Sequence, residues 1–274
     1  MENISKNFNK KKKIIIITGG MGFLGKEYAV TLAQNGFLPI ILDIKRKNEI
    51  DKFVKSINKK YQINTSGFQV DITNEKKVSS VSKKILKKYK KIDTLINNAA
   101  NNPVFKKKFK DSNRLEKFEL KKWNLDLNVG LTGAFICSKY FGDIISKNKN
   151  GGSIINISSD LGLLSPDHRI YNKNSKYFKK VKPISYSVVK SGMIGLSRYL
   201  ATYWLGKVRS NVLCLGGVKD NQDKNFLSSI NKLIPLGRMA NKEDYQGIIK
   251  YLCSDESSYL NGAIIPLDGG RSSW

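Results

Sequence analysis

Seven apolar segments of strand length alternate with longer amphipathic segments, and this alternation constrains the fold more than any other feature. The apolar segments are KIIIITG, PIILDI, FQVDIT, DTLINNA, SIINISS, NVLCLGG and AIIPLDGG. The stretches between them, such as EKKVSSVSKKILKKYKK, have the periodicity of helices. Strands that are apolar on both faces and alternate with helices predict a Rossmann-type, doubly wound parallel sheet of about seven strands, with helices on both faces.

Length and composition favour one large α/β domain in a soluble protein. The chain has 274 residues, 40% of them hydrophobic, and residues 1–11 form a basic tail ahead of a single domain over residues 12–274. We expect the ligand site to be assembled from loops at the carboxyl ends of the strands. No apolar segment approaches the roughly 18 residues of a membrane span, and no cleavage signal follows the tail.

The three cysteines, Cys137, Cys214 and Cys253, lie far apart in the sequence, and two of them are inside apolar segments. Their odd number and their spacing match neither a disulfide framework nor a metal site. We therefore expect reduced residues of the core, in agreement with a cytoplasmic protein, and no bound metal.

The formal net charge of +27 admits two interpretations. A basic surface is typical of proteins that bind nucleic acid. Here the lysines are spread over the whole chain among many Asn and Ile residues, without a stripe of interleaved aromatic residues. We therefore do not expect a nucleic-acid partner, and we expect the charge to attract an anionic small-molecule substrate.

The glycine-rich segment TGGMGFLG follows the first apolar strand and precedes a helix. Its glycines, Gly19, Gly20, Gly22 and Gly25, let backbone N–H groups and a helix N-terminus approach a pyrophosphate without interference from side chains. A tight turn without a ligand is the alternative. The position of the segment between a strand and a helix favours a dinucleotide site.

Asp43 ends the second predicted strand, 18 residues after Gly25. A carboxylate there can accept hydrogen bonds from both hydroxyl groups of the adenosine ribose and repels a 2′-phosphate, which favours NAD(H) over NADP(H). Lys45 and Arg46 follow closely, so NADP(H) stays an alternative. A turn residue without a ligand is the other interpretation of Asp43.

The segment SYSVVKSG places Tyr186 four residues ahead of Lys190. Positions i and i+4 share one face of a helix, so the Lys190 ammonium can favour the ionised form of the Tyr186 phenol. A tyrosine placed in this way is a candidate proton donor. A solvated helix face gives the same short pattern, so the rest of the chain must decide between the two.

Taken in order, the motifs TGGMGFLG, LDIK, VDIT, INNAA, INISS, YSVVK and LDGG resemble those of the short-chain dehydrogenase/reductase family, in its short single-domain branch, from about residue 12 to residue 271. The resemblance implies an NAD(P)-dependent oxidoreductase that transfers a hydride. The catalytic residues that it implies are Ser159, Tyr186 and Lys190. The cofactor contacts that it implies are Gly19, Gly22, Phe23, Leu24, Gly25, Asp43, Asp71, Ile72, Asn98, Ala99, Tyr186, Lys190, Gly216 and Val218.

By the same resemblance, Tyr186 exchanges a proton with the substrate oxygen, and Ser159 hydrogen-bonds that oxygen. Lys190 lowers the pKa of Tyr186 and binds the nicotinamide ribose. Residues 71–72 border the adenine pocket, and residues 97–100, the NNAA segment, line the cofactor cleft. The two amides of that segment can equally close the end of a strand.

The chain departs from the family pattern at several positions. The glycines have the spacing TGxxGxxG, which is typical of the longer nucleotide-sugar branch. The helix asparagine expected seven residues after Trp123 is replaced by Gly130, and Asn128 lies on a different helix face, so water or another side chain must replace it in a proton relay. Leu215 stands where the family has a proline near the nicotinamide, and Asp220 stands where it has a threonine.

The segment that joins Ser159 to Tyr186 is about twice as long as in most members of the family. We expect the insertion, residues 160–182, to lie beside the substrate, and a surface loop without a function is the alternative. Its basic and aromatic side chains are candidates for holding an anionic substrate. These candidates are His168, Arg169, Tyr171 and Tyr177.

The insertion, the segment VGLTGAF and the segment NNAANNP resemble a subgroup associated with surface-sugar biosynthesis, the flagellin modification protein A type. The function implied is NAD(H)-dependent hydride transfer to or from a hydroxyl or carbonyl group of a sugar or nucleotide-sugar-like metabolite. A 3-oxoacyl-thioester reductase is the alternative enzyme, and an inactive cofactor-binding scaffold or nucleic-acid binder is the alternative of another class. The resemblance also implies a homodimer or homotetramer formed through helices over about residues 120–147 and 185–206.

Overall fold

Seven parallel strands form one sheet in the computed structural model, which describes residues 12–101, 113–171 and 180–274. The spatial order is β3-β2-β1-β4-β5-β6-β7, so the chain winds from β1 to one edge and then from β4 to the other. The strands are Ile14–Thr18 (β1), Leu38–Asp43 (β2), Gly67–Gln69 (β3), Thr94–Asn97 (β4), Gly152–Ser159 (β5), Val208–Leu215 (β6) and Ile264–Leu267 (β7). The predicted doubly wound sheet is confirmed, and the predicted basic tail, residues 1–11, lies outside the described residues.

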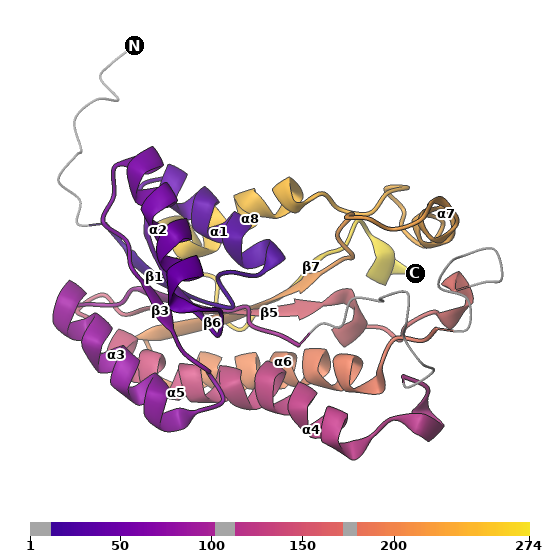
Figure 1. The fold of residues 1–274 in the computed structure, drawn as a ribbon, viewed down its shortest axis with the longest axis horizontal. Coiled ribbons are helices and arrows are strands. Elements are labelled where there is room, and N and C mark those ends of the chain that lie inside the picture. The colour runs from indigo at the N-terminus through magenta and orange to yellow at the C-terminus, as the bar shows by residue number, and fades with distance from the viewer. Residues whose placement is uncertain (1–11, 102–112, 172–179) are drawn as a thin grey trace, which may run out of the picture.

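Helices cover both faces of this sheet (Figure 1). The helices on one face are α1 (Phe23–Gln34), α2 (Lys47–Tyr61) and α8 (Gln246–Cys253). The helices on the other face are α3 (Glu75–Tyr89), α4 (Leu120–Leu127), α5 (Gly133–Ser146) and α6 (Ile184–Tyr203). A shorter helix, α7 (Lys224–Asn231), lies beyond the carboxyl ends of the strands.

The central strand β1 shows why both faces must be covered. All five of its residues are buried; Ile14 and Ile16 pack into the core beneath α3 and α5, and Ile15 and Ile17 pack into the core beneath α1, α2 and α8. Successive side chains of a strand point to opposite faces, so a run of isoleucines supplies both cores at once. The continuous apolar runs of β1, β2 and β4 are therefore strands buried on both sides, whereas β7 at an edge of the sheet is only partly buried.

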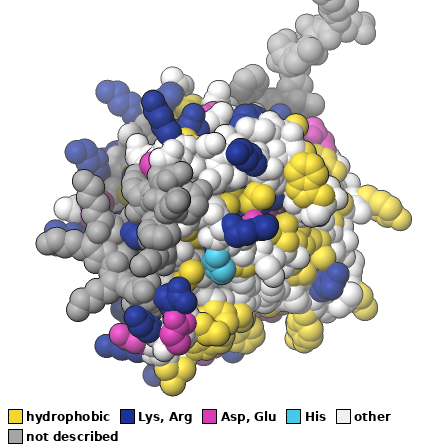
Figure 2. All heavy atoms as spheres, turned by 90° about the vertical axis from the view of Figure 1, so that its right-hand side faces the viewer, with side chains coloured by type: hydrophobic (Ala, Val, Ile, Leu, Met, Phe, Trp, Pro, Cys, Tyr) yellow, Lys and Arg dark blue, Asp and Glu magenta, His cyan; other side chains and the backbone are white. Residues whose placement is uncertain are grey.

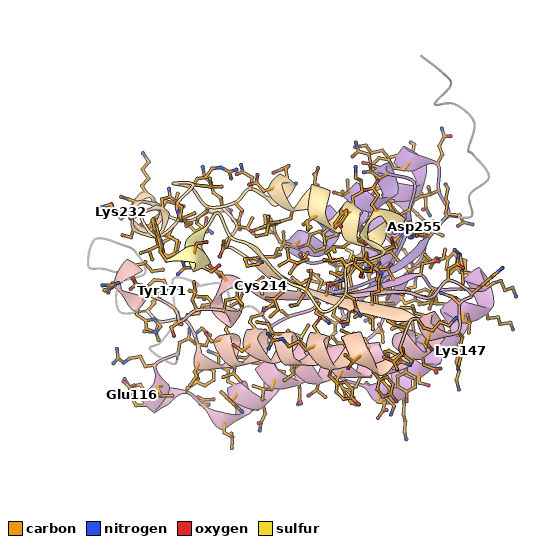
Figure 3. All side chains as sticks on the ribbon, turned by 180° about the vertical axis from the view of Figure 1, so that it is seen from behind. Glu116, Lys147, Tyr171, Cys214, Lys232 and Asp255 are labelled. Carbon is orange, nitrogen blue, oxygen red and sulfur yellow. The ribbon has the colours of Figure 1, made fainter. Side chains whose placement is uncertain are left out.

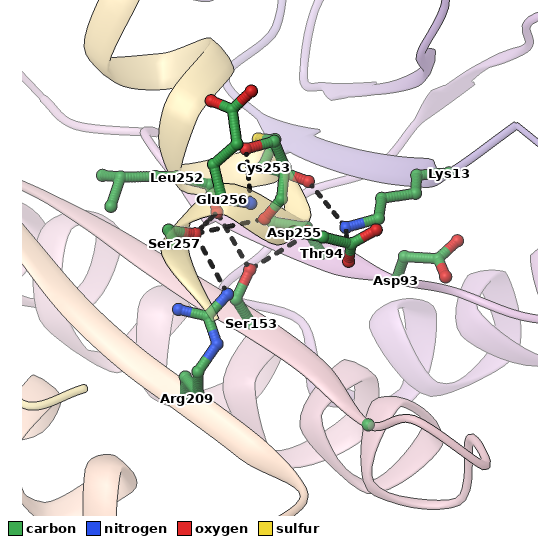
Figure 4. Close-up of polar contacts among 12 residues, drawn as sticks. Lys13, Asp93, Thr94, Ser153, Arg209, Leu252, Cys253, Asp255, Glu256 and Ser257 are labelled. Carbon is green, nitrogen blue, oxygen red and sulfur yellow. Dashed lines mark hydrogen bonds and ion pairs between the residues drawn. The ribbon is translucent and has the colours of Figure 1, made fainter. Parts of the chain in front are cut away.

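A polar network joins the amino-terminal ends of the strands, away from their carboxyl ends (Figure 4). Lys13 donates to the Cys253 carbonyl oxygen at 3.2 Å and pairs with Asp255 at 2.7 Å. Arg209, near the start of β6, donates to the Ser257 hydroxyl at 3.2 Å. These contacts tie β1 and β6 to the segment after α8. They stabilise the edge of the sheet opposite to the expected ligand site.

Cys137, Cys214 and Cys253 are buried and free, as expected from the sequence. Burial raises the pKa of the Cys214 thiol to about 11, which makes it a poor nucleophile at neutral pH. No helix within the described ranges is long and apolar enough to cross a bilayer. The same ranges contain no group of three or more His, Cys, Asp or Glu side chains that could hold a metal ion.

Candidate active site

Three of the four residues between β1 and α1 are glycine, and the side chain of the fourth, Met21, packs against the core. Gly19 has a φ of +62°, and a Cβ added there would lie 2.8 Å from the Ala99 Cα atom. A Cβ at Gly25 would lie 2.2 Å from the Gly19 carbonyl oxygen. Gly22 caps α1 and contributes no side-chain hydrogen bond to the helix. The first N–H groups of α1 thus face outward across bare backbone, which fits the pyrophosphate of a dinucleotide.

Asn98 and Thr18 brace this turn. The Asn98 side-chain amide donates to the carbonyl oxygens of Thr18 at 2.9 Å and Gly19 at 3.1 Å. The Thr18 hydroxyl accepts from the backbone N–H groups of Asn98 at 3.0 Å and Ala99 at 3.1 Å. The end of β4 and the turn after β1 are therefore held together as one unit. The Asn98 side chain does close a strand end, as the sequence allowed.

Four other predicted cofactor residues lie at the carboxyl ends of β1 and β3. Phe23 is 52% exposed at the start of α1, whereas Leu24 packs against the core. Asp71 accepts from the Thr73 N–H and hydroxyl groups at 2.9 and 2.7 Å. Ile72 is buried within the core, so a nucleotide would meet its backbone rather than its side chain.

Asp43 lies at the end of β2, against the glycine-rich turn, and is 8% exposed. Its carboxylate accepts from the backbone N–H groups of Met21 at 2.8 Å and Lys45 at 3.0 Å. Each carboxylate oxygen has lone pairs for a second hydrogen bond. Asp43 therefore stabilises the turn, as the alternative interpretation holds, and it also fits the hydroxyl groups of a ribose.

Ser159, Tyr186 and Lys190 lie together at the carboxyl end of β5. Ser159 is the last residue of β5, and its hydroxyl is close enough to the Tyr186 phenol to act on the pKa of that phenol. Tyr186 and Lys190 are one turn apart on α6, with the Lys190 Nζ 5.7 Å from the centroid of the Tyr186 ring. Lys190 is 5% exposed and donates to the Ile157 carbonyl oxygen at 2.8 Å. The structure thus brings the three predicted catalytic side chains into one site.

Burial dominates the acid–base properties of these side chains. It raises the pKa of Tyr186 to about 12; the Ser159 hydroxyl opposes this rise, and the Asp160 carboxylate adds to it. Burial, together with the nearby Lys182 ammonium, also lowers the pKa of Lys190, to about 8. The sequence led us to expect that Lys190 lowers the pKa of Tyr186, but the loss of water around the phenol outweighs that effect in this structure.

A second lysine faces the same phenol. The Nζ of Lys182, four residues before Tyr186, lies 3.9 Å from the centroid of the phenol ring, within the range of a cation–π contact. Burial lowers the pKa of Lys182 to about 8, and the Asp160 carboxylate opposes this shift. Sequence reasoning missed Lys182. The available signal was the spacing, because Lys182 and Lys190 stand four residues to either side of Tyr186.

Asp160, directly after Ser159, forms a buried ion pair with Arg271. The Arg271 Nη1 and Asp160 Oδ2 atoms are 2.7 Å apart, and the two side chains are 9% and 3% exposed. Asp160 Oδ1 accepts from the Ser159 hydroxyl at 2.7 Å and from the Leu161 N–H at 2.8 Å. Sequence reasoning missed this pair as well. The signal was that both residues follow strand ends, which meet at one edge of a parallel sheet.

The helix that packs beside α6 is interrupted by a π-helical segment, Asn128–Thr132, between α4 and α5. Gly130 is buried there, and a Cβ added to it would lie 2.5 Å from the Val189 side chain of α6. Asn128 is exposed. The two residues thus lie on different faces, as expected, and neither brings an amide to Tyr186.

Asp126 is the buried residue of α4. It accepts a hydrogen bond from the Ser185 hydroxyl and another from the Asn101 side-chain amide at 2.6 Å. Ser185 directly precedes Tyr186, so Asp126 fixes the first turn of α6 to the loop after β4. Sequence reasoning missed this contact, which has no short-range signal.

The loop after β6 carries the two other predicted cofactor residues. The Gly216 carbonyl oxygen accepts from the Tyr245 hydroxyl at 2.8 Å, and a Cβ at Gly216 would lie 2.9 Å from the Asp268 Cα atom. Val218 pairs with Ala240 in an isolated parallel bridge. Close packing against the segment after β7 therefore requires the glycine, whether or not a cofactor is bound.

The described part of the insertion packs against α7. Ile170 and Tyr171 form a small core with residues of α7 and the segment after it. The Tyr171 ring stacks on Phe226 of α7, with centroids 5.8 Å apart. Figure 3 shows Tyr171 at the same end of the molecule as Lys232, opposite to Lys147. Tyr171 therefore belongs to a small packed cluster of side chains beyond the carboxyl ends of the strands.

The other candidate substrate contacts of the insertion lie at the surface or outside the described residues. His168 is exposed, with its ring 6.5 Å from that of Tyr171. The Arg169 side chain is 90% exposed and pairs with Asp167 at 2.8 Å. Tyr177 lies outside the described residues. Figure 2, which views this end of the molecule, shows basic and hydrophobic side chains side by side.

Comparisons with known proteins agree with this arrangement. A family model described as enoyl-(acyl carrier protein) reductase matches residues 22–272. The chain is 28% identical over 263 residues to the post-translational flagellin modification protein A of Campylobacter coli, covering 95% of this chain and 98% of that protein. It is 31% identical over 266 residues to a 3-oxoacyl-[acyl-carrier-protein] reductase of Buchnera aphidicola, covering 95% and 97%.

Among solved structures, a short-chain dehydrogenase from Leptospira borgpetersenii with bound NAD+ matches with a TM-score of 0.81. That protein is 30% identical in sequence, and the match covers 99% of this chain and 98% of that one. Motif order, sheet topology, the Ser159–Tyr186–Lys190 site and these matches agree with one another. The chain belongs to the short-chain dehydrogenase/reductase family of oxidoreductases.

Proposed function

We propose that this chain is an NAD(H)-dependent oxidoreductase that acts on a hydroxyl or carbonyl group of an anionic, sugar-like metabolite. The observation that carries the proposal is the assembly of Ser159, Tyr186 and Lys190 at the carboxyl end of β5. A phenol that lies near a serine hydroxyl and a buried ammonium can transfer a proton to or from a substrate oxygen. The bare-backbone turn in front of α1 supports a dinucleotide as the second reactant.

The residues of the chain divide the work of the reaction. A bound nicotinamide supplies or accepts the hydride. Tyr186 gives its proton to the substrate oxygen during reduction and takes a proton from it during oxidation, while Ser159 holds the same oxygen. The ammonium of Lys190, fixed by the Ile157 carbonyl oxygen, stabilises the Tyr186 phenolate, which reduction leaves behind and from which oxidation starts. Gly19, Gly25 and the start of α1 hold the pyrophosphate.

The preference for NAD(H) rests on Asp43. Its carboxylate is held against the glycine-rich turn by two backbone N–H groups. A 2′-phosphate in this place would meet a buried negative charge, whereas ribose hydroxyl groups would meet an acceptor. Lys45 and Arg46 follow Asp43 in the chain, so NADP(H) is the alternative cofactor, and a direct comparison of the two decides between them.

An anionic, sugar-like substrate is supported by charge and by likeness. Lys182 places an ammonium group beside the catalytic phenol, and the chain as a whole has a formal net charge of +27. Such a field attracts anions to the site. The relative from Campylobacter coli is named for flagellin modification, which supports a role in surface-sugar biosynthesis. We propose that the enzyme acts in the cytoplasm and that it is a homodimer or a homotetramer.

A 3-oxoacyl-thioester reductase is the second candidate, because the relative from Buchnera aphidicola bears that name. An acidic carrier protein would also suit a strongly basic partner. An inactive scaffold or nucleic-acid binder is the candidate of another class. The complete set of Ser159, Tyr186 and Lys190 speaks against it, since a scaffold needs none of them.

The test is a screen of NAD+ and NADP+ with sugar acids, nucleotide sugars and a 3-hydroxyacyl thioester. The absorbance of the reduced nicotinamide measures the turnover of each pair. We expect turnover with NAD+ and an anionic sugar substrate. Tyr186→Phe should lower kcat by about 100-fold or more without changing the Kd for NADH. Tyr259→Phe, at an exposed position outside the helices expected to pair, is the matched control and should leave kcat unchanged.

Three outcomes would contradict the proposal. Wild-type turnover by the Tyr186→Phe variant would remove Tyr186 from the reaction. Turnover restricted to the thioester would favour the second candidate. Binding to nonspecific DNA that weakens steeply with salt, without turnover of any substrate, would favour the nucleic-acid binder.

A further inference from the structure

The ion pair between Asp160 and Arg271 is the buried charged pair closest in sequence to the proposed catalytic serine. It joins the residue after β5 to the segment after β7, which are 111 positions apart. The two side chains are 3% and 9% exposed. A buried ion pair adds little stability compared with an apolar pair of the same size, because both charges lose their water. Stability alone therefore gives a weak reason for this pair.

The pair is hydrogen-bonded to Ser159. An ionised carboxylate only accepts hydrogen bonds, so the 2.7 Å contact is donated by the Ser159 hydroxyl to Asp160 Oδ1. The Leu161 N–H donates to the same oxygen at 2.8 Å, and Arg271 holds the other oxygen at 2.7 Å. Three donors thus fix Asp160: the Ser159 hydroxyl, the Leu161 N–H group and the Arg271 guanidinium. The Ser159 hydroxyl has one proton, so it must turn from Asp160 before it donates to a substrate carbonyl oxygen, and the position of Asp160 controls that turn.

The pair also lies within the electrostatic environment of the Tyr186 phenol. The titratable and charged groups around that phenol come from the start of α6 and from the ends of the neighbouring strands. They are Lys182, Lys190, Asp160, Arg271 (through Asp160), Cys214 (through Lys190) and Tyr245. Within this group the Asp160 carboxylate disfavours the Tyr186 phenolate. The Arg271 cation neutralises the charge of Asp160.

We propose that Asp160 and Arg271 are positioning residues of the reaction: the pair orients the Ser159 hydroxyl and sets the balance of charge beside Tyr186. The segment after β7 thereby becomes part of the site. The proposal rests on the proposed function of Ser159 and Tyr186. It goes beyond that function because neither member of the pair needs to touch the substrate or the cofactor.

The sign of the electrostatic effect gives a test that a purely structural role would not pass. Asp160→Asn removes a negative charge near the phenol, so it should lower the apparent pKa of Tyr186 and raise its ionisation constant about tenfold. Arg271→Gln leaves that negative charge without its partner, so it should lower the ionisation constant about tenfold. The double variant Asp160→Asn/Arg271→Gln should lie within about threefold of the wild type, and Arg271→Lys should do the same.

The direct measurement is carbon-13 NMR of protein that carries tyrosine labelled at Cζ. The Tyr186 signal is the one that disappears in Tyr186→Phe, and its change with pH reports ionisation without any substrate or cofactor. The second measurement is kcat/KM for oxidation as a function of pH, whose rising limb should move in the same two directions. If the NMR shifts appear but no substrate turns over, the proposed function fails and the electrostatic role of the pair stands.

Arg238→Gln is the matched control, because Arg238 pairs with Asp244 at the surface at 2.6 Å. It should leave the Tyr186 signal unchanged. Shifts of the same sign in Asp160→Asn and Arg271→Gln, or no shift in either, would overturn the proposal. If Arg271→Gln does not fold, Asp160→Asn and the double variant still decide: a wild-type ionisation constant in Asp160→Asn would overturn it.

Discussion

The Nζ of Lys182 lies 3.9 Å from the centre of the Tyr186 ring, closer than the Nζ of Lys190, which lies at 5.7 Å. Lys190 is the lysine that the sequence motif assigns to catalysis, whereas Lys182 is the last lysine of the insertion. The phenol therefore has two ammonium groups near it, and the nearer one comes from residues 160–182, the segment just before α6.

We predict that Lys182→Gln raises the apparent pKa of Tyr186 and lowers kcat/KM for an anionic substrate by about tenfold at neutral pH, because the phenolate and the substrate lose a nearby cation. The pKa of Lys182 is lowered to about 8 by burial. Above that pH the wild-type lysine loses its proton, so the difference between wild type and variant should shrink.

The pH profile of kcat/KM checks this prediction. Lys182→Arg should retain the effect of the charge to higher pH, since arginine keeps its proton. Lys147→Gln, at the opposite end of the molecule (Figure 3), is the control for a general loss of positive charge. A constant ratio of wild type to Lys182→Gln across pH 8 would show that the charge of Lys182 has no role.

A second prediction concerns the stability of the fold as a function of pH. Burial lowers the pKa of Lys190 to about 8 from its ordinary value of 10.5. Below about pH 8 the folded chain carries the full penalty of a buried ammonium group, and above about pH 10.5 it carries none. Between these values the unfolded chain binds more protons, so the free energy of unfolding should rise with pH.

Lys190→Met removes this dependence. At pH 7 the variant should be more stable than the wild type by roughly 2 kcal/mol, because relief of the desolvated charge outweighs the lost hydrogen bond to Ile157. The advantage should vanish by about pH 10.5. Urea unfolding at several pH values measures it, with Lys147→Met as the exposed control. A variant that is less stable than wild type at pH 7 would contradict the prediction.

A third prediction concerns the cofactor. Asp43→Ala should weaken binding of NADH by about tenfold and bring its Kd closer to that of NADPH, because the ribose loses an acceptor and a 2′-phosphate no longer meets a carboxylate. The titration of both cofactors against wild type and variant measures it. Asp143→Ala changes an exposed carboxylate of α5, outside the predicted cofactor contacts, and serves as the control. Tighter binding of NADPH than NADH by the wild type would refute the preference.

The fourth prediction concerns the insertion. Replacement of residues 163–180 by a short polar linker should lower kcat/KM by about tenfold or more, the loss of roughly 1.4 kcal/mol of transition-state binding, with little change in the Kd for NADH. Tyr171→Ala should reproduce part of the loss, because its ring stacks on Phe226 of α7. Arg169→Ala, at a 90% exposed side chain, should have less effect than Tyr171→Ala. Near wild-type turnover in a folded linker variant would make the insertion a surface elaboration.

The fifth prediction concerns assembly. Large hydrophobic side chains are exposed on the helices expected to pair, with Leu125 at 53%, Phe135 at 52% and Tyr199 at 63%. Phe135→Glu should convert an oligomer into monomers, because a charge would be buried in an apolar interface. Light scattering at micromolar concentration checks it, and Tyr259→Glu, exposed elsewhere, is the control. A wild-type monomer at that concentration would contradict the expectation.

The fold was predictable because the signal for it is local and repeated. Most apolar runs, such as residues 14–17, are long enough for a strand and are buried on both faces, whereas β7 at the edge of the sheet is only partly buried. The carboxyl ends of the parallel strands lie at one edge of the sheet. Ser159 ends β5 there, and the first turns of α6 bring Tyr186 next to it. The spacing of Tyr186 and Lys190 likewise fixed their common helix face.

The rest of the site depends on contacts that no short pattern contains. Asp160 and Arg271 meet across 111 positions, and only the finished sheet brings them together. The acid–base properties of Tyr186 follow from its burial, which the i, i+4 spacing does not report. The position of Tyr171 on α7 depends on a core formed by the insertion itself. These features follow from packing rather than from periodicity.

The π-helical segment Asn128–Thr132 has a consequence for the two helices that it joins. Each residue of an α-helix turns the chain by about 100°, and a π segment holds an extra residue within the turn. The side chains of α5 are therefore rotated about the helix axis from the positions that an uninterrupted α-helix continuing from α4 would give them. A helical wheel drawn through residues 120–146 as one α-helix would assign the wrong face to the residues on one side of the segment.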